Sequence, residues 1–544
     1  MAASPVATAP PAETRPRHPA FFSLGSLLLI APLCVVGAVI GTQLIVTLGI
    51  TTNTSLIGAL AGMMLARLPL RIFRRYRSVH MQNLAQSAIS AATFGAGNAL
   101  LLPIGIPFVM GRPDLVLPML LGVFLAMLVD GYLLYRVFDS EIFPTSGAWP
   151  PGVAAAEAIR AGDQGGRKGL VLLCGLGVGI GGSLFFTGVM SAFGVAFIGN
   201  IWALSMFGCG LLVRGYSRLL FGAILPGGDI SAAYVPHGMM VGAGLVALVQ
   251  VVVLMLRGDH GASLGTQRSA GSVRRSLGGG SLAYVLIALL LALLGGLWSA
   301  LSPGMLVLFV VYAAFAALAH ELIVGLAAMH AGWFPAFAVA LITLVIGMLI
   351  GFPPTALTLL VGFCAATGPA FADMGYDLKA GSMLRGGGAD PAFERDGRRQ
   401  QLFAAMFAFV IAGLVVLLAH PAYFAGGLVA PVDKVYAATI KAGASSAVAW
   451  KLLAWAIPGA ILQVLGGPKR QLGVLFATGL LIAFPAAGWA VLLGVVLRLL
   501  WMRLRGSAGQ ADMEVFAAGV IAGDALYSFY DLGARYAARQ AHSR

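Results

Sequence analysis

Long apolar runs, separated by short polar or Gly- and Pro-rich segments, recur along the whole of this 544-residue chain. A helix needs about 17 to 25 mostly apolar residues to cross a bilayer, and about sixteen runs approach that length. They lie at 22–50, 52–66, 82–110, 114–136, 169–192, 196–213, 233–256, 282–300, 303–325, 335–352, 354–372, 401–420, 446–465, 471–484, 486–502 and 513–531. The pattern predicts an all-α polytopic integral membrane protein, with some re-entrant or broken helices.

The polar segments divide the chain into five parts. We predict a disordered cytosolic tail at 1–21, transmembrane halves at 22–256 and 282–532, a basic Gly/Ser/Arg-rich cytoplasmic linker at 257–281, and a basic C-terminal tail at 533–544. The two halves hold similar numbers of runs, which indicates internal duplication. Such repeats are common in transporters, whose binding sites lie where the repeats meet.

Composition supports this assignment, because only 10% of the residues are charged, against about 25% in soluble proteins. The net charge of +14 does not point to nucleic acid, since the bases lie in short loops between apolar runs. They include Arg67, Arg71, Arg74, Arg75 and Arg77 in one block, and Arg268, Arg274 and Arg275 in another. By the positive-inside rule these loops face the cytoplasm, and we expect a multi-pass protein of the inner (plasma) membrane.

The same rule tests the order of the crossings. Residues 169–256 must cross an even number of times between two cytoplasmic segments, yet three runs lie there. We therefore expect one of these runs, or the break at 219–238, to be a half-helix or an extra crossing. The count then leaves the C-terminal tail outside.

The four cysteines are isolated within apolar runs, at positions 34, 174, 209 and 364, so neither a disulfide framework nor a metal site is expected. No cofactor is expected, and the chain has no phosphate-binding loop of the G-x-x-x-x-G-K-(S/T) type for ATP. Gly177 and Gly181 form a GxxxG motif that predicts close helix packing. The alternative is a permeation path lined by exposed backbone.

The segment WPPGVAAAEAIRAGDQGG at 149–166 predicts a helix too short to cross a membrane. It begins at Pro150 and Pro151 and ends at Gly162, which suits the positional preferences of these residues. Glu157 and Arg160 share a face and can form an ion pair. The segment is either an amphipathic helix at the cytoplasmic surface or an N-terminal anion site facing a cavity.

Ionisable residues in or beside the apolar runs give a separate indication of function, because a charge in hydrocarbon costs about 2.5 to 3.5 kcal/mol on insertion scales. They are Asp130, Asp229, His237, His320, Glu321, Asp373, Asp377, Lys379 and Asp524. Asp130 is expected to pair with Arg136. His320 and Glu321 are adjacent and point apart on a helix, which weakens the case for a proton-carrying dyad.

Two of these acids, Asp373 and Asp377, lie four residues apart on one helix face and can carry a proton between them; the alternative is a loop held by ion pairs. Asp524 lies in the last run, one turn from Tyr527. Asp229 and His237 flank the 219–238 break. Its Pro226, Gly227, Gly228 and Pro236 suit unwound backbone beside a cavity.

Four segments together resemble the oligopeptide transporter family, which includes peptide carriers and the yellow stripe-like carriers of metal chelates. The first runs from Pro150 to Gly162, and the second is MQNLAQSAISAA at 81–92, through Asn83, Gln86 and Ser87. The third is ADMGYDLKAG at 372–381, followed by Arg398, Arg399, Gln400 and Gln401. The fourth is AGDAL at 522–526, where the family usually carries A-G-E. They occur in the family's order and span the chain.

The resemblance implies symport of protons with short peptides, peptide-like molecules or metal chelates. Broken helices at 150–162 and 219–238 would then fix the charged ends of the substrate, and Asp373, Asp377 or Asp524 would carry the proton. The candidate binding or coupling residues are Asn83, Gln86, Gly152, Glu157, Arg160, Asp229, His237, Asp373, Asp377, Lys379, Asp524 and Tyr527.

This chain departs from the family pattern in two places. Thr93 stands where the family usually has an acid, which puts in doubt a proton or cation site described for relatives. The NPG motif of the eukaryotic peptide carriers is not evident, which favours the bacterial and yellow stripe-like branch.

Two other classes compete with a transporter. A channel would use similar cavities. An intramembrane aspartyl protease would use Asp377 and Asp524, but the second motif lacks its first glycine and such proteases need far fewer helices. We therefore expect a carrier rather than an enzyme, with a small-molecule or peptide substrate, protons and the lipid bilayer as its partners.

Overall fold

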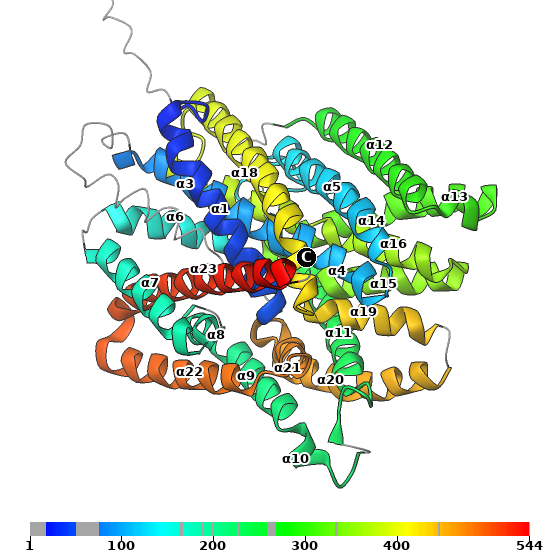
Figure 1. Ribbon diagram of the computed structural model, residues 1–544. Coiled ribbons are helices and arrows are strands. Elements are labelled where there is room, and N and C mark those ends of the chain that lie inside the picture. The colour runs from blue at the N-terminus through cyan, green and yellow to red at the C-terminus, as the bar shows by residue number, and fades with distance from the viewer. Residues whose placement is uncertain are drawn as a thin grey trace, which may run out of the picture.

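A computed structural model describes residues 18–49, 76–163, 167–186, 189–198, 200–225, 228–257, 268–331, 336–443 and 446–542 (Figure 1). Within these ranges the regular elements are helices, and the only β feature is an isolated bridge between Phe138 and Phe143. Ten of the described helices are long and apolar enough to cross a membrane. The prediction of an all-α polytopic membrane protein is therefore confirmed.

The helices of the first half begin with α1 (Leu24–Thr47), α3 (Val79–Phe94), the π-helix η2 (Gly95–Leu101), α4 (Leu102–Val109), η3 (Pro113–Leu115) and α5 (Val116–Val137). They continue with α6 (Pro150–Asp163), α7 (Arg167–Phe185), α8 (Val189–Val195), α9 (Ile201–Gly215), α10 (Ser217–Phe221) and α11 (Val235–Arg257).

The helices of the second half begin with α12 (Ala270–Leu294), α13 (Leu297–Ala300), α14 (Pro303–Ala331), α15 (Ala336–Ile350), α16 (Pro354–Ala366) and α17 (Pro369–Leu384). They continue with α18 (Pro391–Ala425), α19 (Pro431–Ala442), α20 (Ser446–Arg470), α21 (Leu472–Leu480), α22 (Pro485–Arg505), η5 (Gly506–Gly509) and α23 (Gln510–His542).

The predicted number of about sixteen spans is not reached in the described residues. Among the described residues, the apolar helices at 201–215 and 336–350 are too short to count among the ten, and α21 has nine residues. Helices α7 and α11 have 19 and 23 residues, but their side chains are described only in part. The predicted run at 52–66 lies outside the described residues. Turns and prolines shorten these helices, so an apolar run is a poor measure of helix length here.

Two long spans form the centre of the protein, one with a π-helical stretch in its middle and one discontinuous. In an 18-residue apolar stretch of each span, 89% of the residues are buried for α3, η2 and α4 and 94% for α16 and α17, more than for any other candidate span among the described helices. The second is broken at Thr367 and Gly368, where the positive φ of Gly368 interrupts the helix. The spans lie antiparallel, with α3 beside α17 and α4 beside α16.

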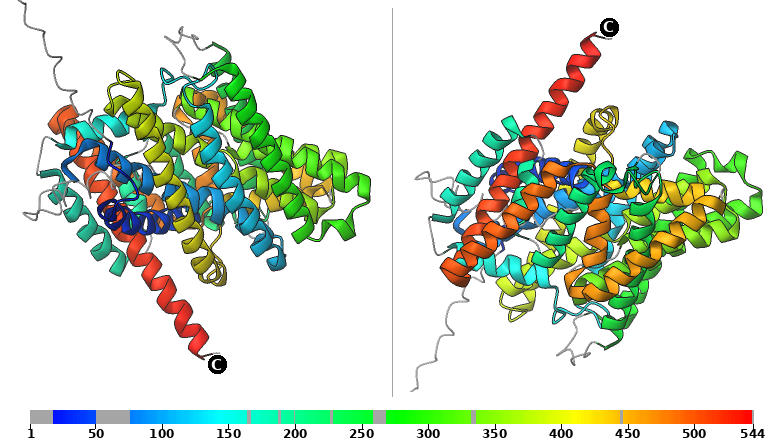
Figure 2. Two further views of the ribbon diagram at one scale, coloured as in Figure 1. Left: turned by 90° about the horizontal axis from the view of Figure 1, so that it is seen from above. Right: turned by 90° about the horizontal axis from the view of Figure 1, so that it is seen from below.

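Several basic segments meet at one end of the bundle. His18 and His80 pack against Phe393, and Arg398 forms an ion pair with Asp139. The backbone N–H of Arg268 donates to the carbonyl of Asp139, which brings the start of α12 to the same place. This common end is what the positive-inside assignment requires. The C-terminal part of α23 lies near the opposite end of α18 and projects beyond the other helices (Figure 2).

Close packing of α7 and α23 depends on glycines other than those predicted. A Cβ at Gly175 or Gly179 would lie 2.2 Å from a carbonyl oxygen of α23, and one at Gly519 would lie 2.3 Å from a carbonyl oxygen of α7. Gly177 and Gly181, the predicted motif, have no such neighbour within 4 Å. The GxxxG prediction was correct in kind but wrong by two residues, which turns the motif to the other helix face.

The predicted tails and linker are only partly described. Residues 1–17 and 258–267 lie outside the described ranges. Residues 270–281, expected to be part of a flexible linker, instead form the beginning of α12. Helix α12 is therefore longer at its start than the apolar run at 282–300 predicts, because its first turns are polar.

Candidate functional site

The central polar cluster joins α3 to α17. The carboxamide of Gln86 donates to Asp377 Oδ1 at 2.5 Å, and the hydroxyl of Ser90 donates to Asp373 Oδ1 at 2.5 Å. Asn83 donates to Gln86 Oε1 at 2.9 Å. All five side chains are buried. Two of the segments that resemble the family, far apart in sequence, therefore meet in the core.

The third element of this cluster is α18. The Gln401 carboxamide donates to Ser87 Oγ at 3.0 Å and to the backbone carbonyl of Asp377 at 2.7 Å. Its own oxygen accepts from Arg385 Nη1 at 2.8 Å. Gln401 thus holds α3 and α17 at a fixed separation beside the two acids.

The outer layer of the cluster is ionic. Glu394 pairs with Arg385 at 2.8 Å and with Arg398 at 2.7 Å, and Arg398 also reaches Asp139 at 3.1 Å. Lys379 donates to the backbone carbonyl of Thr145 at 2.9 Å. The cations of this region are therefore committed to partners other than the two central carboxyl groups.

Each central acid has one oxygen without a partner. Asp373 Oδ2 and Asp377 Oδ2 are buried and accept no hydrogen bond, and neither carboxyl group takes part in an ion pair among the described residues. Asn83 Oδ1 is likewise buried without a donor. The site therefore presents three buried acceptor oxygens whose needs the described protein groups do not meet.

At position 93, where the resemblance implies a missing acid, the threonine hydroxyl is directed toward α1. The Thr93 hydroxyl is 2.8 Å from the carbonyl of Ile89 and 3.0 Å from the carbonyl of Gly37 on α1. It is Ser90, one turn earlier, that contacts Asp373.

The short helix α6 packs along α17. A Cβ on Gly152 would lie 2.4 Å from the carbonyl oxygen of Tyr376, and a Cβ on Gly375 would lie 2.1 Å from the ring of Trp149. The N–H groups of Gly152 and Val153 donate to the carbonyl of Trp149, so neither is available to an anion. The structure therefore favours a helix packed on the core over the predicted anion site.

The predicted ion pair on α6 is wrong. Glu157 and Arg160 are both exposed, and no ion pair joins them in the described part of the chain. Arg160 instead donates to the backbone carbonyl of Met383 at the end of α17. A carbonyl at a helix C-terminus is a suitable partner for a guanidinium, since the helix dipole is negative there.

Asp524 lies in a different polar environment. Its carboxylate accepts from the Ser183 hydroxyl on α7 and, at 2.7 Å, from the backbone N–H of Ser191 on α8. These partners and those of Asp377 have no residue in common, so the contacts do not support a catalytic carboxyl pair. Tyr527, predicted beside Asp524, is partly exposed.

Asp229 and His237 do not join the central cluster. Asp229 accepts from the N–H of Ser231 at 2.9 Å and from Arg214 at 2.6 Å, and these donors hold the pKa of its carboxyl below its ordinary value. His237 packs against Tyr234. Pro226 and Gly227, the centre of the predicted break, lie outside the described residues.

Asp130 pairs with a different group from the one predicted. It accepts from Tyr284 of α12 at 2.6 Å and from the backbone N–H of Gly368 at 2.7 Å, while Arg136 donates to Tyr132. Asp130 therefore secures the break between α16 and α17. His320 contacts the carbonyl of Ala336 at 2.9 Å, and both carboxyl oxygens of the neighbouring Glu321 are buried without a hydrogen-bond partner.

Four buried ionic residues were missed by the sequence reasoning, and one of them is Asp139, the partner of Arg398. Arg385 and Glu394 lie in a segment that looks like a charged loop, and only their pairing in three dimensions makes them core residues. Asp433 follows Pro431 at the start of α19, is fully buried, and has both carboxyl oxygens without a partner. An acid beside a proline in an apolar stretch was the available signal.

A bundle of membrane-spanning helices, whose two most buried spans are joined by polar side chains at the centre, defines a polytopic membrane protein. The family described as OPT oligopeptide transporter protein matches residues 25–256 and 279–532. The chain belongs to this family, whose members are transporters rather than enzymes. A search of curated proteins finds no match. The segment between the two matched regions corresponds to the predicted linker, and the branch within the family stays a prediction.

Proposed function

We propose that this chain is a secondary active transporter that couples inward proton movement to the uptake of short peptides or peptide-like molecules. The observation that carries the proposal is the Asp373–Asp377 pair, which is buried where the discontinuous α16–α17 span packs against α3, with only neutral side-chain donors on its carboxyl oxygens. Family membership supports a transport function, and the Asp373–Asp377 pair supports the proton as the coupling ion.

The argument for a proton starts from charge. Ser90 and Gln86 each supply a neutral donor to one of the two acids, and the nearby cations are engaged by Glu394, Asp139 and the carbonyl of Thr145. Two uncompensated carboxylates on one face of a buried helix repel each other strongly, and a bound proton removes that repulsion. The pair is therefore suited to load a proton before transport and release it afterwards.

The argument for substrate class starts from the acceptor oxygens. Asn83 Oδ1 and the outer oxygens of Asp373 and Asp377 need donors. A peptide offers an ammonium group and backbone N–H groups, whereas a metal chelate of carboxylate ligands presents mainly acceptors. Peptides and peptide-like molecules are thus favoured over metal chelates, which remain the second candidate.

Asp524 fits a structural role in this proposal. Its carboxylate is held by donors from α7 and α8, where these helices meet α23. We assign it to helix packing and the proton to the α17 pair.

The test is uptake of labelled di- to pentapeptides, and in parallel ferric chelates, into proteoliposomes containing the full chain. A pH gradient that is acidic outside should drive concentrative peptide uptake, and dissipating the gradient should abolish it. Asp377→Asn keeps an acceptor for Gln86 but cannot titrate, so it should lose gradient-driven uptake while retaining exchange of labelled for unlabelled peptide. The matched control is Asp229→Asn, which should behave as wild type. Flux that is always downhill would instead indicate a channel.

A further inference from the structure

A cationic cavity lies between α5 and α12, away from the central acids. Its volume is about 350 Å³, and it is lined by Tyr132 and Arg136 of α5 and by Arg275, Ser276 and Gly279 of α12. No acidic residue lines it. Gly279 has nothing within 4 Å of its hypothetical Cβ, so its missing side chain leaves the groove open.

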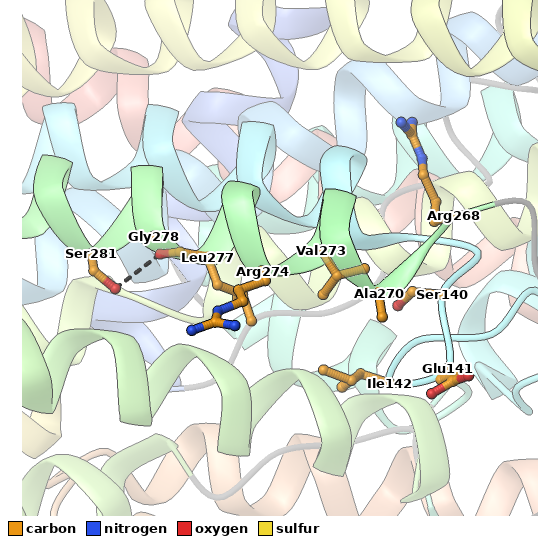
Figure 3. Close-up of a pocket in the computed structure, with 10 residues that line it drawn as sticks. All are labelled: Ser140, Glu141, Ile142, Arg268, Ala270, Val273, Arg274, Leu277, Gly278 and Ser281. Carbon is orange, nitrogen blue, oxygen red and sulfur yellow. Dashed lines mark hydrogen bonds between the residues drawn. The ribbon is translucent and has the colours of Figure 1, made fainter.

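A second cavity lies on the other side of the first turns of α12. Its volume is about 490 Å³, and its lining includes Arg268, Arg274 and Glu141 (Figure 3). Figure 3 shows Arg274 extending from α12 while Arg268 points the other way. The guanidinium group of Arg268 lies over the aromatic ring of Tyr135. Arginines therefore surround the beginning of α12 on both sides.

None of the four arginines in these cavities forms an ion pair with a described residue. Arg136 donates to Tyr132 through Nη1 and lies over its ring, yet its Nε is buried without a partner. Among the described residues, Arg275 donates through its Nε to the carbonyl of Gly271, and no partner is seen for its other N–H groups. Guanidinium groups from two helices thus share one cavity with most of their donors unused, an arrangement suited to a phosphate.

The position of the first cavity indicates where that phosphate comes from. Arg136 lies in the last turn of one membrane span and Arg275 near the start of another, so both lie where the bilayer meets water. Beyond the cavity, α12 exposes large apolar side chains to the outside. They are Leu282, Leu286, Leu289 and Leu293, with 61%, 58%, 39% and 48% of their surface exposed. A cationic cavity followed by an apolar helix surface fits an amphipathic ligand that has an anionic head group and acyl chains.

We infer that the cavity between α5 and α12 binds the phosphodiester head group of an anionic phospholipid. Arg136 and Arg275 hold the phosphate, Tyr132 borders the head group, and the acyl chains lie along the exposed leucines of α12. The lipid bridges the helices that carry Asp130 and Tyr284, whose hydrogen bonds secure the break at Gly368. Its binding therefore stabilises the bundle around the discontinuous helix.

The test uses the purified full chain in detergent and follows thermal unfolding and lipid retention by native mass spectrometry. Phosphatidylglycerol should raise the unfolding temperature and remain bound, whereas phosphatidylcholine and inorganic phosphate should not. The double variant Arg136→Gln/Arg275→Gln should weaken phosphatidylglycerol binding about thirtyfold. Arg395→Gln, which removes an exposed charge at the same end of the bundle, is the matched control and should leave binding unchanged.

Gly279→Leu provides a second variant that fills the groove and keeps both arginines, so it should also lose the lipid even if the double variant fails to fold. Phosphatidylglycerol binding that survives in Gly279→Leu would overturn the inference. If inorganic phosphate stabilises the protein as much as phosphatidylglycerol does, the cavity binds a soluble anion, and the inference of a lipid site is overturned. Equal binding of phosphatidylcholine would show that the arginines do not select the charge, and would also contradict it.

Discussion

Gln86 and Asp377 are 291 residues apart in the chain, yet a 2.5 Å hydrogen bond joins them at the centre of the bundle. This bond fixes α3 against α17 and leaves the other carboxyl oxygen of Asp377 without a protein donor. Positioning of the acid and its capacity to take up a proton or a substrate group therefore depend on different oxygens of the same side chain.

Gln86→Leu should impair transport by removing the amide that donates to Asp377 Oδ1 while keeping a similar side-chain volume. An unsatisfied buried acceptor costs about 1 to 3 kcal/mol, so uptake per folded molecule should fall by a factor of about 5 to 150. The measurement is kcat/KM for gradient-driven uptake in proteoliposomes. Gln82→Leu is the control, because Gln82 is buried on the same helix but donates to the carbonyl of Tyr76. Equal effects of the two variants would contradict a specific role for Gln86.

The sequence identified candidate polar residues by their chemical type, but it could not show which of them lie together in the folded protein. A carboxyl group inside an apolar run signals function because its burial is costly, and this reasoning found Asp373 and Asp377. Asn83 and Gln86 were predicted from the resemblance to the family's motif. The reasoning from burial also selected Asp524 and Asp229, which have their own local partners. Only the tertiary contacts separate the two groups, because a buried acid looks the same in sequence whether or not a donor meets it.

Helix ends and helix faces were the least predictable features. The break at Gly368 depends on one positive φ and on Asp130 of another helix, and the short helices depend on turns within apolar stretches. The hydrophobicity of a run does not indicate where such a turn occurs. Likewise, GLGVGIGG contains two overlapping GxxxG motifs, one with Gly177 and one with Gly179. Which of them packs closely depends on which face of α7 meets α23.

Gly179→Ala should destabilise the protein by separating α7 from α23. Its Cβ would lie 2.2 Å from the carbonyl oxygen of Val520, and overpacking of this kind costs about 1 to 3 kcal/mol. Gly177→Ala is the matched control, since nothing lies within 4 Å and alanine favours a helix. Thermal unfolding in one detergent should rank Gly179→Ala well below wild type and Gly177→Ala at or above it. The reverse ranking would show that the predicted face makes the contact.

Arg398→Ala should be far more damaging than Arg399→Ala, although the two arginines are neighbours in one motif. Arg398 is buried against Glu394 and Asp139, so its loss leaves carboxylates short of a cation, at a cost of about 3 to 5 kcal/mol. Arg399 is exposed over the ring of Phe403, and its loss should cost less than about 1 kcal/mol. Chemical denaturation or thermal unfolding of the purified variants measures the difference. Similar losses would contradict the ionic layer described above.

His18 should make the attachment of the N-terminal segment depend on pH. Burial, reinforced by Arg385, lowers the pKa of His18 from 6.5 to about 4, while His80 and Asp396 also face it. The detached segment therefore binds a proton more readily than the docked one, and docking, complete above about pH 6.5, should weaken as the pH falls towards 4.

Hydrogen–deuterium exchange of residues 20–26, corrected for the intrinsic effect of pH, should be faster at pH 5 than at pH 7.5. The N–H of Phe21 reports the change directly, because it donates to Gln400 Oε1 when the segment is docked. His18→Asn keeps a polar side chain that does not titrate between these values and should remove most of the pH dependence. If the dependence persists in His18→Asn but disappears in His80→Asn, the sensor is His80, and the assignment to His18 is wrong.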